Sequence, residues 1–418
     1  MRGLNARSNL ERHRRTIIGV YPPSNPSDSA AQRNRHKHGH EMPSPSPAWV
    51  RAMTTPQDFA AEQAALGRLW TFLGFNSDIP AINDWFRTTL GGRSIFVQRF
   101  EIGMRGFENR CAHRNYPLRN TERGNGAIVC GFHHWRYNHE GLALGIPQCA
   151  EMFGKTPREL DARLEPVEIE TCGEMIFGRF SGGDPVSLRE WLGPGFDILA
   201  HMVGAPPRHN RIASQVAAHW KLMMAISLDD YHIVAVHPST FGKGGYLPQE
   251  IISYQRFGAH SAYLPGGDAS TLETIRAACA EGTFVAQRYR IFQFFPNLIV
   301  AFIRATNYLG ETYWYSLVQQ LIPLAHDRTR SVTRFVLHPF REEAPAWRRL
   351  ARRHALPWIS GGFWFYARKI HREDNETCEN LQKTVAQVKS EPILAAQEQR
   401  IRWFEEEYAR YTGFAREG

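Results

Sequence analysis

Apolar and polar positions divide the 418-residue chain into three stretches of different character. From Met1 to about Pro56 there is no apolar period, and the abundance of Arg, Ser, Pro and His predicts a disordered, basic extension over residues 1–56. Over residues 57–182, short apolar runs alternate with Gly and Asn turns, which is typical of a small β domain. The strands expected there are Ile95–Phe100, Gly126–Val129, Glu140–Leu144 and Met175–Phe180.

After Ser181-Gly182-Gly183 the pattern changes, and residues 183–418 combine helical periods with strand-like runs. The helices expected there are Val216–Ile233, Leu272–Glu281 and the polar, periodic stretch Glu373–Tyr411. The strands expected are Ile291–Phe295, Leu298–Ile303, Thr312–Gln319 and Val332–Leu337. Strands with helices grouped around them favour an antiparallel sheet. The fold class expected is therefore α+β, with an N-terminal all-β domain followed by an α+β domain.

Composition and charge narrow the class of protein. The chain is 43% apolar and 22% charged, as in ordinary soluble proteins, and its apolar runs are too short to cross a bilayer. The formal charge is +9, but residues 1–50 hold eight Lys/Arg and three Asp/Glu, so the other 368 residues carry only +4. Because no basic stripe is interleaved with stacking aromatics, we expect neither a nucleic-acid partner nor a membrane partner.

Six cysteines in a chain of this length, with no secretory signal ahead of them, do not indicate a disulfide framework. A reducing compartment, the cytoplasm, is the expected location, and cysteine patterns in such compartments more often bind metal. Four of the six lie outside any motif and are interpreted as packing thiols: Cys149, Cys172, Cys279 and Cys378.

The other two cysteines belong to a paired motif. Cys111-Ala112-His113 is followed after sixteen residues by Cys130-Gly131-Phe132-His133. One Cys and one His from each of two loops suit a [2Fe–2S] cluster in which one iron takes both thiolates and the other both imidazoles. A structural zinc ion is the alternative, although zinc sites usually pair Cys with Cys and His with His.

A second motif lies about a hundred residues further on, where Asp229, His232 and His237 form D-x-x-H-x-x-x-x-H. On a helix, Asp229 and His232 share a face, whereas His237 requires the helix to bulge or end, and Pro238 favours such a break. Two histidines and one carboxylate bind non-haem Fe(II) and leave positions open for O₂. The carboxylate need not be local. Alone, this spacing is weak, because the chain has eighteen histidines.

Together the two motifs resemble a known family. Asn109-Arg110-Cys111-Ala112-His113-Arg114 and the run from Cys130 to Tyr137 are similar to the two cluster loops of Rieske domains, with His134 where glycine is usual. The second motif, preceded by Trp220-Lys221, resembles the catalytic domain of ring-hydroxylating oxygenase α subunits, with Ala225-Ile226 in place of the usual Asn or Glu-Asn. The resemblance covers roughly residues 58–415.

The resemblance implies a Rieske [2Fe–2S] domain over residues 57–182 and a mononuclear non-haem iron domain over residues 183–418. It implies that the cluster is held by Cys111, His113, Cys130 and His133, and the Fe(II) by His232, His237 and Asp374, the last preferred to Glu373. Asp229 matches the family's catalytic aspartate, which links an iron-ligating histidine to the cluster histidine of a neighbouring subunit in a head-to-tail ring. A homotrimer is expected, with a β subunit possible.

Function and partners follow from the same resemblance. No G-x-G-x-x-G stands at a strand-to-helix turn, so no bound flavin or NAD is expected, and a separate reductase, with or without ferredoxin, would supply electrons from NAD(P)H. The expected reaction is O₂-dependent ring dihydroxylation, monohydroxylation or oxidative demethylation of an apolar, aromatic substrate. Some aromatics of Phe292–Phe295, Tyr313–Tyr315 and Phe363–Tyr366 should line its pocket. An electron-transfer Rieske protein and a zinc-stabilised binding protein are the alternatives.

Overall fold

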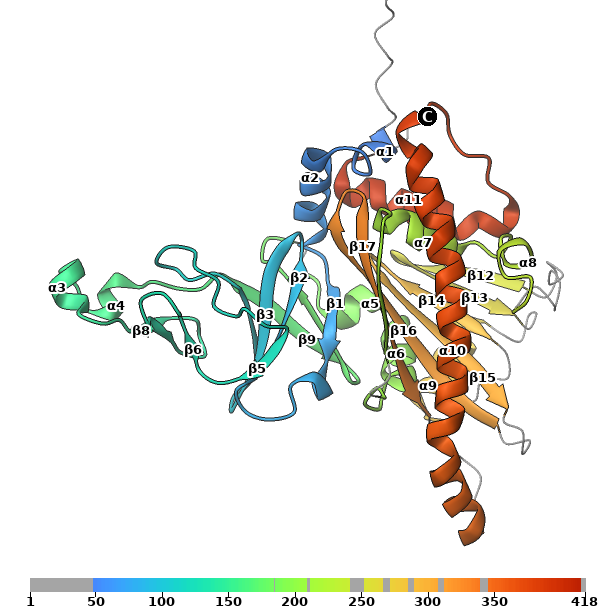
Figure 1. Cartoon of the computed structure of the whole chain (residues 1–418), viewed down its shortest axis with the longest axis horizontal. Helices are drawn as coiled ribbons and strands as arrows, with labels where there is room; N and C mark the ends of the chain where they lie inside the picture. Colours follow the sequence, from blue (N-terminus) through green and yellow to red (C-terminus); the bar gives the residue numbers. More distant parts are fainter. Residues whose placement is uncertain are drawn as a thin grey trace, which may run out of the picture. The chain divides into compact units, whose positions relative to one another are not determined.

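A computed structural model describes residues 48–183, 185–208, 211–240, 252–265, 271–284, 289–306, 312–338 and 345–414 (Figure 1). Two antiparallel sheets of seven strands each and one of three strands organise these residues. The first sheet contains, in spatial order, β1 (Thr71–Phe75), β10 (Met175–Arg179), β9 (Pro166–Cys172), β4 (Gly103–Glu108), β3 (Arg93–Phe100), β2 (Asp84–Leu90) and β5 (Arg123–Asn125).

The two loops that carry the Cys-His pairs each follow a strand, one in the first sheet and one in the three-stranded sheet. Cys111 follows β4, and Cys130 follows β6 directly. The three-stranded sheet consists of β6 (Ile128–Val129), β7 (Arg136–Tyr137) and β8 (Ala143–Gly145). Because β6 and β7 pair on either side of the second loop, the sheet fixes both ends of that loop.

The second sheet is the scaffold of the other motif. In spatial order it contains β11 (Arg211–Val216), β17 (Arg328–Leu337), β16 (Thr312–Ala325), β15 (Leu298–Thr306), β14 (Arg290–Phe294), β13 (His260–Pro265) and β12 (Ile252–Phe257). Every neighbouring pair is antiparallel. The observed sheets and helices confirm the expected α+β class, and the four strands expected after residue 290 are present.

Both faces of the second sheet are buried, because its strands alternate between two apolar cores. Phe292 and Phe294 of β14 belong to a core with helices α5, α6 and α9, whereas Ile291 belongs to a core with α7, α10 and α11. Figure 1 shows α10 crossing this second face. The helices and their bounds are α5 (Leu188–Leu192), α6 (Gly195–Met202), α7 (Trp220–Leu228), α8 (Ile233–Val236), α9 (Leu272–Ala280), α10 (Ala346–Thr384) and α11 (Gln399–Thr412).

The smaller elements complete the described residues. They are α1 (Ala48–Arg51), α2 (Pro56–Leu66), α3 (Cys149–Phe153), α4 (Pro157–Leu160) and the 3-10 turns η1 (Asn76–Asp78), η5 (Val385–Gln387) and η6 (Ala396–Glu398). Among all these helices, none is both long enough and apolar enough to cross a membrane. The four cysteines interpreted as packing thiols are all buried.

The expected helix Val216–Ile233 is present as α7 (Trp220–Leu228) but wrong in its bounds, because the chain leaves helical geometry at Asp229. Val216 ends β11, α7 ends at Leu228, and Asp229 is extended at φ −98° and ψ 123°. The Asp229 Oδ1 accepts hydrogen bonds from the backbone N–H groups of Tyr231 at 2.6 Å and His232 at 3.3 Å. An aspartate that binds its own backbone competes with helical hydrogen bonds, and this turn therefore separates α7 from α8.

The expected helix Glu373–Tyr411 is also wrong in its bounds. Glu373 lies well inside the 39-residue α10, which begins at Ala346, and the helical pattern resumes only with α11 at Gln399. Between them lies Pro392, which lacks an N–H donor and disfavours helical geometry in the residue before it.

The expected disordered extension differs from the structure at its end. Trp49, Val50 and Met53 are buried in a small core with Val385, and α1 and α2 are helical. The rest of that extension, residues 1–47, lies outside the described residues.

A buried acid joins α2 to the helices beside the second motif. Glu62 accepts hydrogen bonds from Trp220 Nε1 at 2.8 Å and from the Tyr408 hydroxyl, and its Oε2 lies 3.4 Å from His219 Nε2. Burial raises the pKa of Glu62, but His219 and these hydrogen bonds outweigh burial and hold the pKa below its ordinary value. The N-terminal helix is therefore tied to α7 and α11 by a charged, fully buried contact.

We predict that Glu62→Ala destabilises the protein by about 3 kcal/mol, because it leaves three buried polar groups without a partner. Thermal unfolding followed by circular dichroism should show a clear fall in the melting temperature. The control is Gln57→Ala, an exposed position on the same helix, which should leave the melting temperature unchanged. Equal melting temperatures for the two variants would contradict this role.

Candidate metal centres

The two Cys-His loops share one backbone geometry. The N–H of Cys111 donates to the Tyr116 carbonyl, and the N–H of Cys130 donates to the Trp135 carbonyl, both at 2.8 Å. A left-handed residue stands four positions after each cysteine, Asn115 at φ 57° and His134 at φ 56°. The structure thus explains why glycine is usual at position 134, since a side chain there costs about 1 kcal/mol.

These loops bring the four predicted cluster residues together. Both cysteines are buried, and the Nδ1 atoms of His113 and His133 lie 3.2 Å apart. Among the described residues, however, no three of these four groups place their ligand atoms within 4.8 Å of one another. A single tetrahedral zinc ion requires that compactness, whereas a two-iron cluster spreads thiolates and imidazoles over two ions. The donor set and its spread therefore fit a [2Fe–2S] group.

Neighbouring side chains prepare these ligands. The Tyr137 hydroxyl lies 3.0 Å from Cys111 Sγ and accepts a hydrogen bond from the Ala112 N–H at 3.0 Å. The imidazole of His113 stacks on Trp135, with ring centroids 4.8 Å apart. Burial lowers the pKa of His113, and the charge of His133 lowers it further. A neutral imidazole is the form that binds metal.

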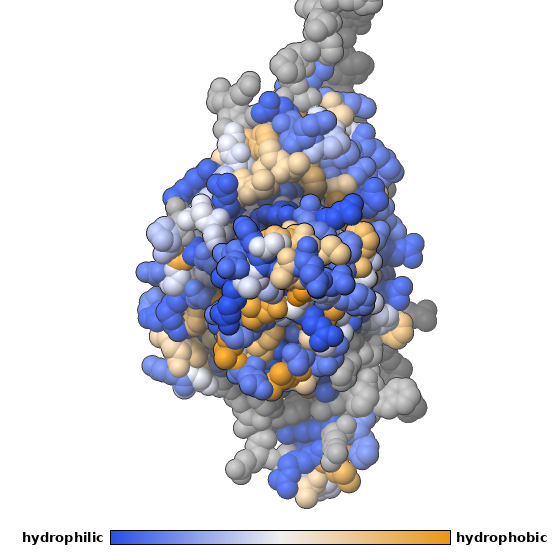
Figure 2. Space-filling model, turned by 90° about the vertical axis from the view of Figure 1, so that its left-hand side faces the viewer, coloured by the Kyte–Doolittle hydropathy of each residue, from blue (hydrophilic) through white to orange (hydrophobic). Residues whose placement is uncertain are grey.

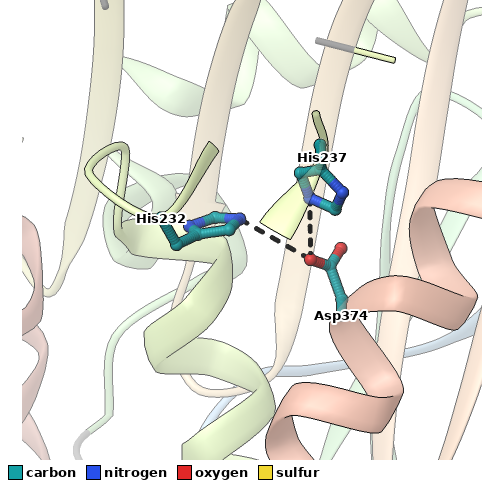
Figure 3. A group of neighbouring side chains, drawn as sticks. All are labelled: His232, His237 and Asp374. Atoms are coloured by element: carbon teal, nitrogen blue, oxygen red, sulfur yellow. Dashed lines mark ion pairs between the residues drawn. The ribbon is translucent and has the colours of Figure 1, made fainter. Parts of the chain in front are cut away.

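The second constellation gathers around Asp374 of α10 (Figure 3). Its Oδ1 lies 2.9 Å from His237 Nε2 and 3.6 Å from His232 Nε2. His232 precedes α8 and His237 follows it, so one short helix turns both imidazoles toward the carboxylate. These three ligand atoms lie within 4.8 Å of one another, and no other such group is found in the described part of the chain.

Two further carboxylates surround the histidines. Glu373 Oε2 lies 2.8 Å from His237 Nδ1, and Asp229 Oδ2 lies 3.5 Å from His232 Nδ1. Burial lowers the pKa of His232, but Asp229 and Asp374 outweigh it and raise the pKa to about 9. Burial raises the pKa of Asp374, yet both histidines outweigh it and lower that pKa. Three carboxylates beside two imidazoles make a centre that stabilises a cation.

The buried atoms also fit a bound ion. Although Asp374 Oδ1 lies close to both histidines, it forms no hydrogen bond of acceptable geometry, and neither does His232 Nδ1. Buried polar atoms are seldom left unpaired, and the Oδ1 atom points to the place where an ion would satisfy all three ligands.

A cavity of about 350 Å³ opens beside these ligands and is mostly apolar. Isoleucines dominate its wall: Ile226, Ile233, Ile252, Ile291, Ile299, Ile303 and Ile370. Of the aromatics expected to line the pocket, only Tyr366 does so among the described side chains, since Phe292 and Phe294 point to the opposite core. The alternation of strand β14 decides this, because the cavity lies on the face of Ile291.

Sequence reasoning missed several groups near the centre. Glu373 was considered only as a rival ligand, whereas the structure places it behind His237. His371, one helical turn before Asp374, lines the cavity and lies 3.1 Å from the Thr333 hydroxyl. Asp230 also lines the cavity: burial raises its pKa to about 6, although Arg400 and a hydrogen bond from Tyr254 act to lower it. The sequence offered a signal only for His371, which lies three residues before Asp374 and so on the same face of a helix.

Comparison with known families matches both parts of the chain. Residues 69–164 match the Rieske [2Fe-2S] domain, and residues 205–413 match the ring hydroxylating alpha subunit (catalytic domain). The second match covers half of the chain.

Named relatives are oxygenases with different substrates. The anthranilate 1,2-dioxygenase large subunit of Burkholderia cepacia is 28% identical over 195 residues, which are 43% of this chain and 44% of that protein. Putrescine 2-hydroxylase of Bordetella bronchiseptica is 28% identical over 240 residues, 50% of this chain and 51% of that protein. The chain therefore spans about half the length of the curated relatives it matches.

Solved structures share the fold over a longer range. Naphthalene 1,2-dioxygenase from Rhodococcus sp., bound to indole, superimposes with a TM-score of 0.67 over 88% of this chain and 94% of that chain, at 20% sequence identity. A quaternary ammonium Rieske monooxygenase superimposes with a TM-score of 0.64 at 16% identity.

The geometry predicts that substituting Asp374 and substituting Glu373 weaken metal binding to different extents. Asp374→Ala should abolish tight binding of one Fe(II), because it removes the atom between both imidazoles. Glu373→Gln should weaken binding roughly 10- to 100-fold, the usual effect of losing a partner that orients a ligand histidine. Anaerobic calorimetric titration of each metal-depleted variant with Fe(II) measures the affinity of the site for iron.

The control for these variants is Glu376→Gln, because Glu376 lies on the same helix with an exposed side chain paired to Arg372. It should bind Fe(II) like the wild type. Complete loss of binding in the Glu373 variant, with binding retained in the Asp374 variant, would reverse the assignment.

Proposed function

Because the chain belongs to the family of ring-hydroxylating α subunits with a Rieske [2Fe–2S] domain, we propose that it is the terminal oxygenase of a multicomponent system. Its cofactors are accordingly a [2Fe–2S] cluster and a mononuclear iron. The observation that carries the proposal is the presence of both centres in one chain, the second with an apolar cavity against it. An electron-transfer protein would have no use for the second.

The proposed ligands are those that the two constellations bring together. Cys111, Cys130, His113 and His133 would hold the cluster. His232, His237 and Asp374 would hold the iron. When bound, the cluster supplies electrons to the iron, which activates O₂. Glu373 holds the His237 imidazole in place, and the isoleucine wall excludes water and positions an apolar substrate.

Asp229 is proposed to link the two centres across a subunit boundary. Its carboxylate lies beside His232 and is 17% exposed, so it is open to a group of a neighbouring chain. The cluster imidazoles are likewise edged by exposed apolar side chains, with Phe132 at 3.8 Å from His133 between ring centroids and Phe153 at 6.0 Å from His113. Such an edge suits a protein partner, either a second copy in a head-to-tail trimer or an electron donor.

Figure 2 views the end of the molecule that Figure 1 draws on its left, where α3 and β8 lie, and shows hydrophobic atoms gathered among hydrophilic ones. Met152 of α3 is 67% exposed and Leu144 of β8 is also exposed. This surface supports the proposal that a reductase, with or without ferredoxin, delivers electrons there. The same surface also suits contact with a β subunit.

The proposed substrate is a small aromatic compound. The cavity volume of about 350 Å³ and its isoleucine wall favour a ring over a long or highly charged molecule. Several relatives are named for aromatic substrates, among them anthranilate and terephthalate. Ring dihydroxylation, monohydroxylation and oxidative demethylation use the same ligands, so the reaction is proposed at the level of O₂-dependent hydroxylation.

Metal and sulfide analysis, with low-temperature EPR of the dithionite-reduced protein, tests the function directly. About three irons and two sulfides per chain are expected, with a Rieske-type signal. Zinc without sulfide would refute the oxygenase and favour a zinc-stabilised protein. A Rieske signal with two irons that persists after Fe(II) reconstitution would instead favour an electron-transfer protein.

We predict that Asp229→Asn keeps both metals yet lowers turnover roughly 100-fold or more, as when a positioned acid-base group is removed. Asparagine retains the side-chain oxygen that caps the turn at Tyr231 and His232 but loses the charge beside the imidazole. O₂ uptake with a surrogate reductase, together with iron content, measures the two effects. Normal turnover in this variant would remove Asp229 from the electron path.

A further inference from the structure

A buried carboxylate that belongs to neither proposed metal centre faces the cavity. Asp230 is 9% exposed and lines the cavity, next to the proposed electron-path residue Asp229. Its Oδ2 accepts a hydrogen bond from the Tyr254 hydroxyl at 2.8 Å. Within the described residues Oδ1 has no hydrogen-bond partner. A carboxylate held in this way retains free acceptor capacity toward the cavity.

A buried cation that does not line the cavity, Arg400, carries the charge opposite to that of Asp230. Arg400 of α11 is fully buried, and its Nε donates to Ser261 Oγ at 3.2 Å. Neither Nη atom has a hydrogen-bond partner among the described residues. Burial lowers the pKa of Arg400, and Asp230 is the foremost of the charged groups that act to raise it. A buried cation needs a compensating charge, and Asp230 provides it without a direct hydrogen bond.

Asp230 therefore adds a polar group to the wall of a mostly apolar cavity, and Arg400, which does not line the cavity, offsets part of its charge. The Asp230 carboxylate would repel an anionic substituent, and Arg400, which already offsets the charge of that carboxylate, would reduce the gain for a cationic one. A hydrocarbon would displace water from Oδ1 and leave that acceptor without a partner. Only a neutral group with a hydrogen-bond donor satisfies Oδ1 without adding charge.

We propose that Asp230 selects ring substrates that carry a neutral hydrogen-bond donor, a hydroxyl or an uncharged amino group, and that Arg400 supplies its compensating charge. The inference rests on the proposed function, since it takes the cavity beside the iron ligands as the substrate site. It adds the substrate class and a specificity-determining residue. Tyr254 has a positioning role, because its hydroxyl fixes the orientation of the carboxylate.

Binding of four matched probes tests this proposal without turnover. Naphthalene, 1-naphthol, 1-naphthoate and protonated 1-naphthylmethylamine share one ring system and differ in the substituent. Calorimetry on the holoprotein, without reductant, should give 1-naphthol a dissociation constant about tenfold or more below that of naphthalene, the lower range for a hydrogen bond to a charged group. The two ionic probes should bind more weakly than 1-naphthol. Equal binding of naphthalene and 1-naphthol, or tightest binding of an ionic probe, would overturn the proposal.

Variants link the preference to Asp230. Asp230→Ala alone leaves the Arg400 charge buried without compensation and can fail to fold, so the double variant Asp230→Ala/Arg400→Met removes both charges. It should bind naphthalene and 1-naphthol within about twofold of each other, if the lost hydrogen bond is the cause. Ser227→Ala is the control: its hydroxyl lines the same cavity but already donates to the Met223 carbonyl, and the preference should persist. Persistence in the double variant would overturn the role of Asp230.

Metal analysis on the same samples separates this inference from the proposed function. If iron, sulfide and the Rieske signal are present while none of the four probes binds, the substrate inference fails and the oxygenase assignment stands. If iron and sulfide are absent, the proposed function fails and the inference that rests on it fails too.

Discussion

The geometry of the proposed iron site depends on one carboxylate oxygen, Asp374 Oδ1, which lies between two imidazoles that come from another part of the chain. Without a cation, three carboxylates crowd two histidines, and the high pKa of His232 shows how strongly their negative charge acts. Holding these groups in place requires a rigid frame, because each would otherwise separate or seek water. The frame is the long helix α10 on one side and the turn after α7 on the other.

The second sheet holds that frame. Strands β13 to β17 place buried side chains in both cores, so these strands are held from both faces, and α7 and α10 pack on the same face. The buried contact of Glu62 with Trp220 and Tyr408 ties α7 to the N-terminal and C-terminal helices. Glu62 is therefore a buried structural residue. Its contacts fix the position of α7, the helix that ends just before Asp229.

The cluster loops are held in a different way. Each contains the same turn, with a left-handed residue four positions after its cysteine, so local hydrogen bonds help to bring each Cys-His pair into place. The imidazole edges reach the surface among exposed aromatic side chains, while the proposed iron ligands are largely buried. This contrast agrees with the proposed route of electrons from the cluster to the iron.

The sequence by itself determined what local spacing can encode. The two Cys-His pairs, the histidines at 232 and 237, four strands of the second sheet and two of the first follow from short-range patterns, because neighbouring residues fix turns and alternation. Tertiary structure decided the rest. It placed Glu373 behind His237, decided that the cavity lies on the Ile291 face of β14, and put Asp230 against Tyr254. Each of these depends on contacts between residues distant in sequence, and no periodicity records which distant groups will meet.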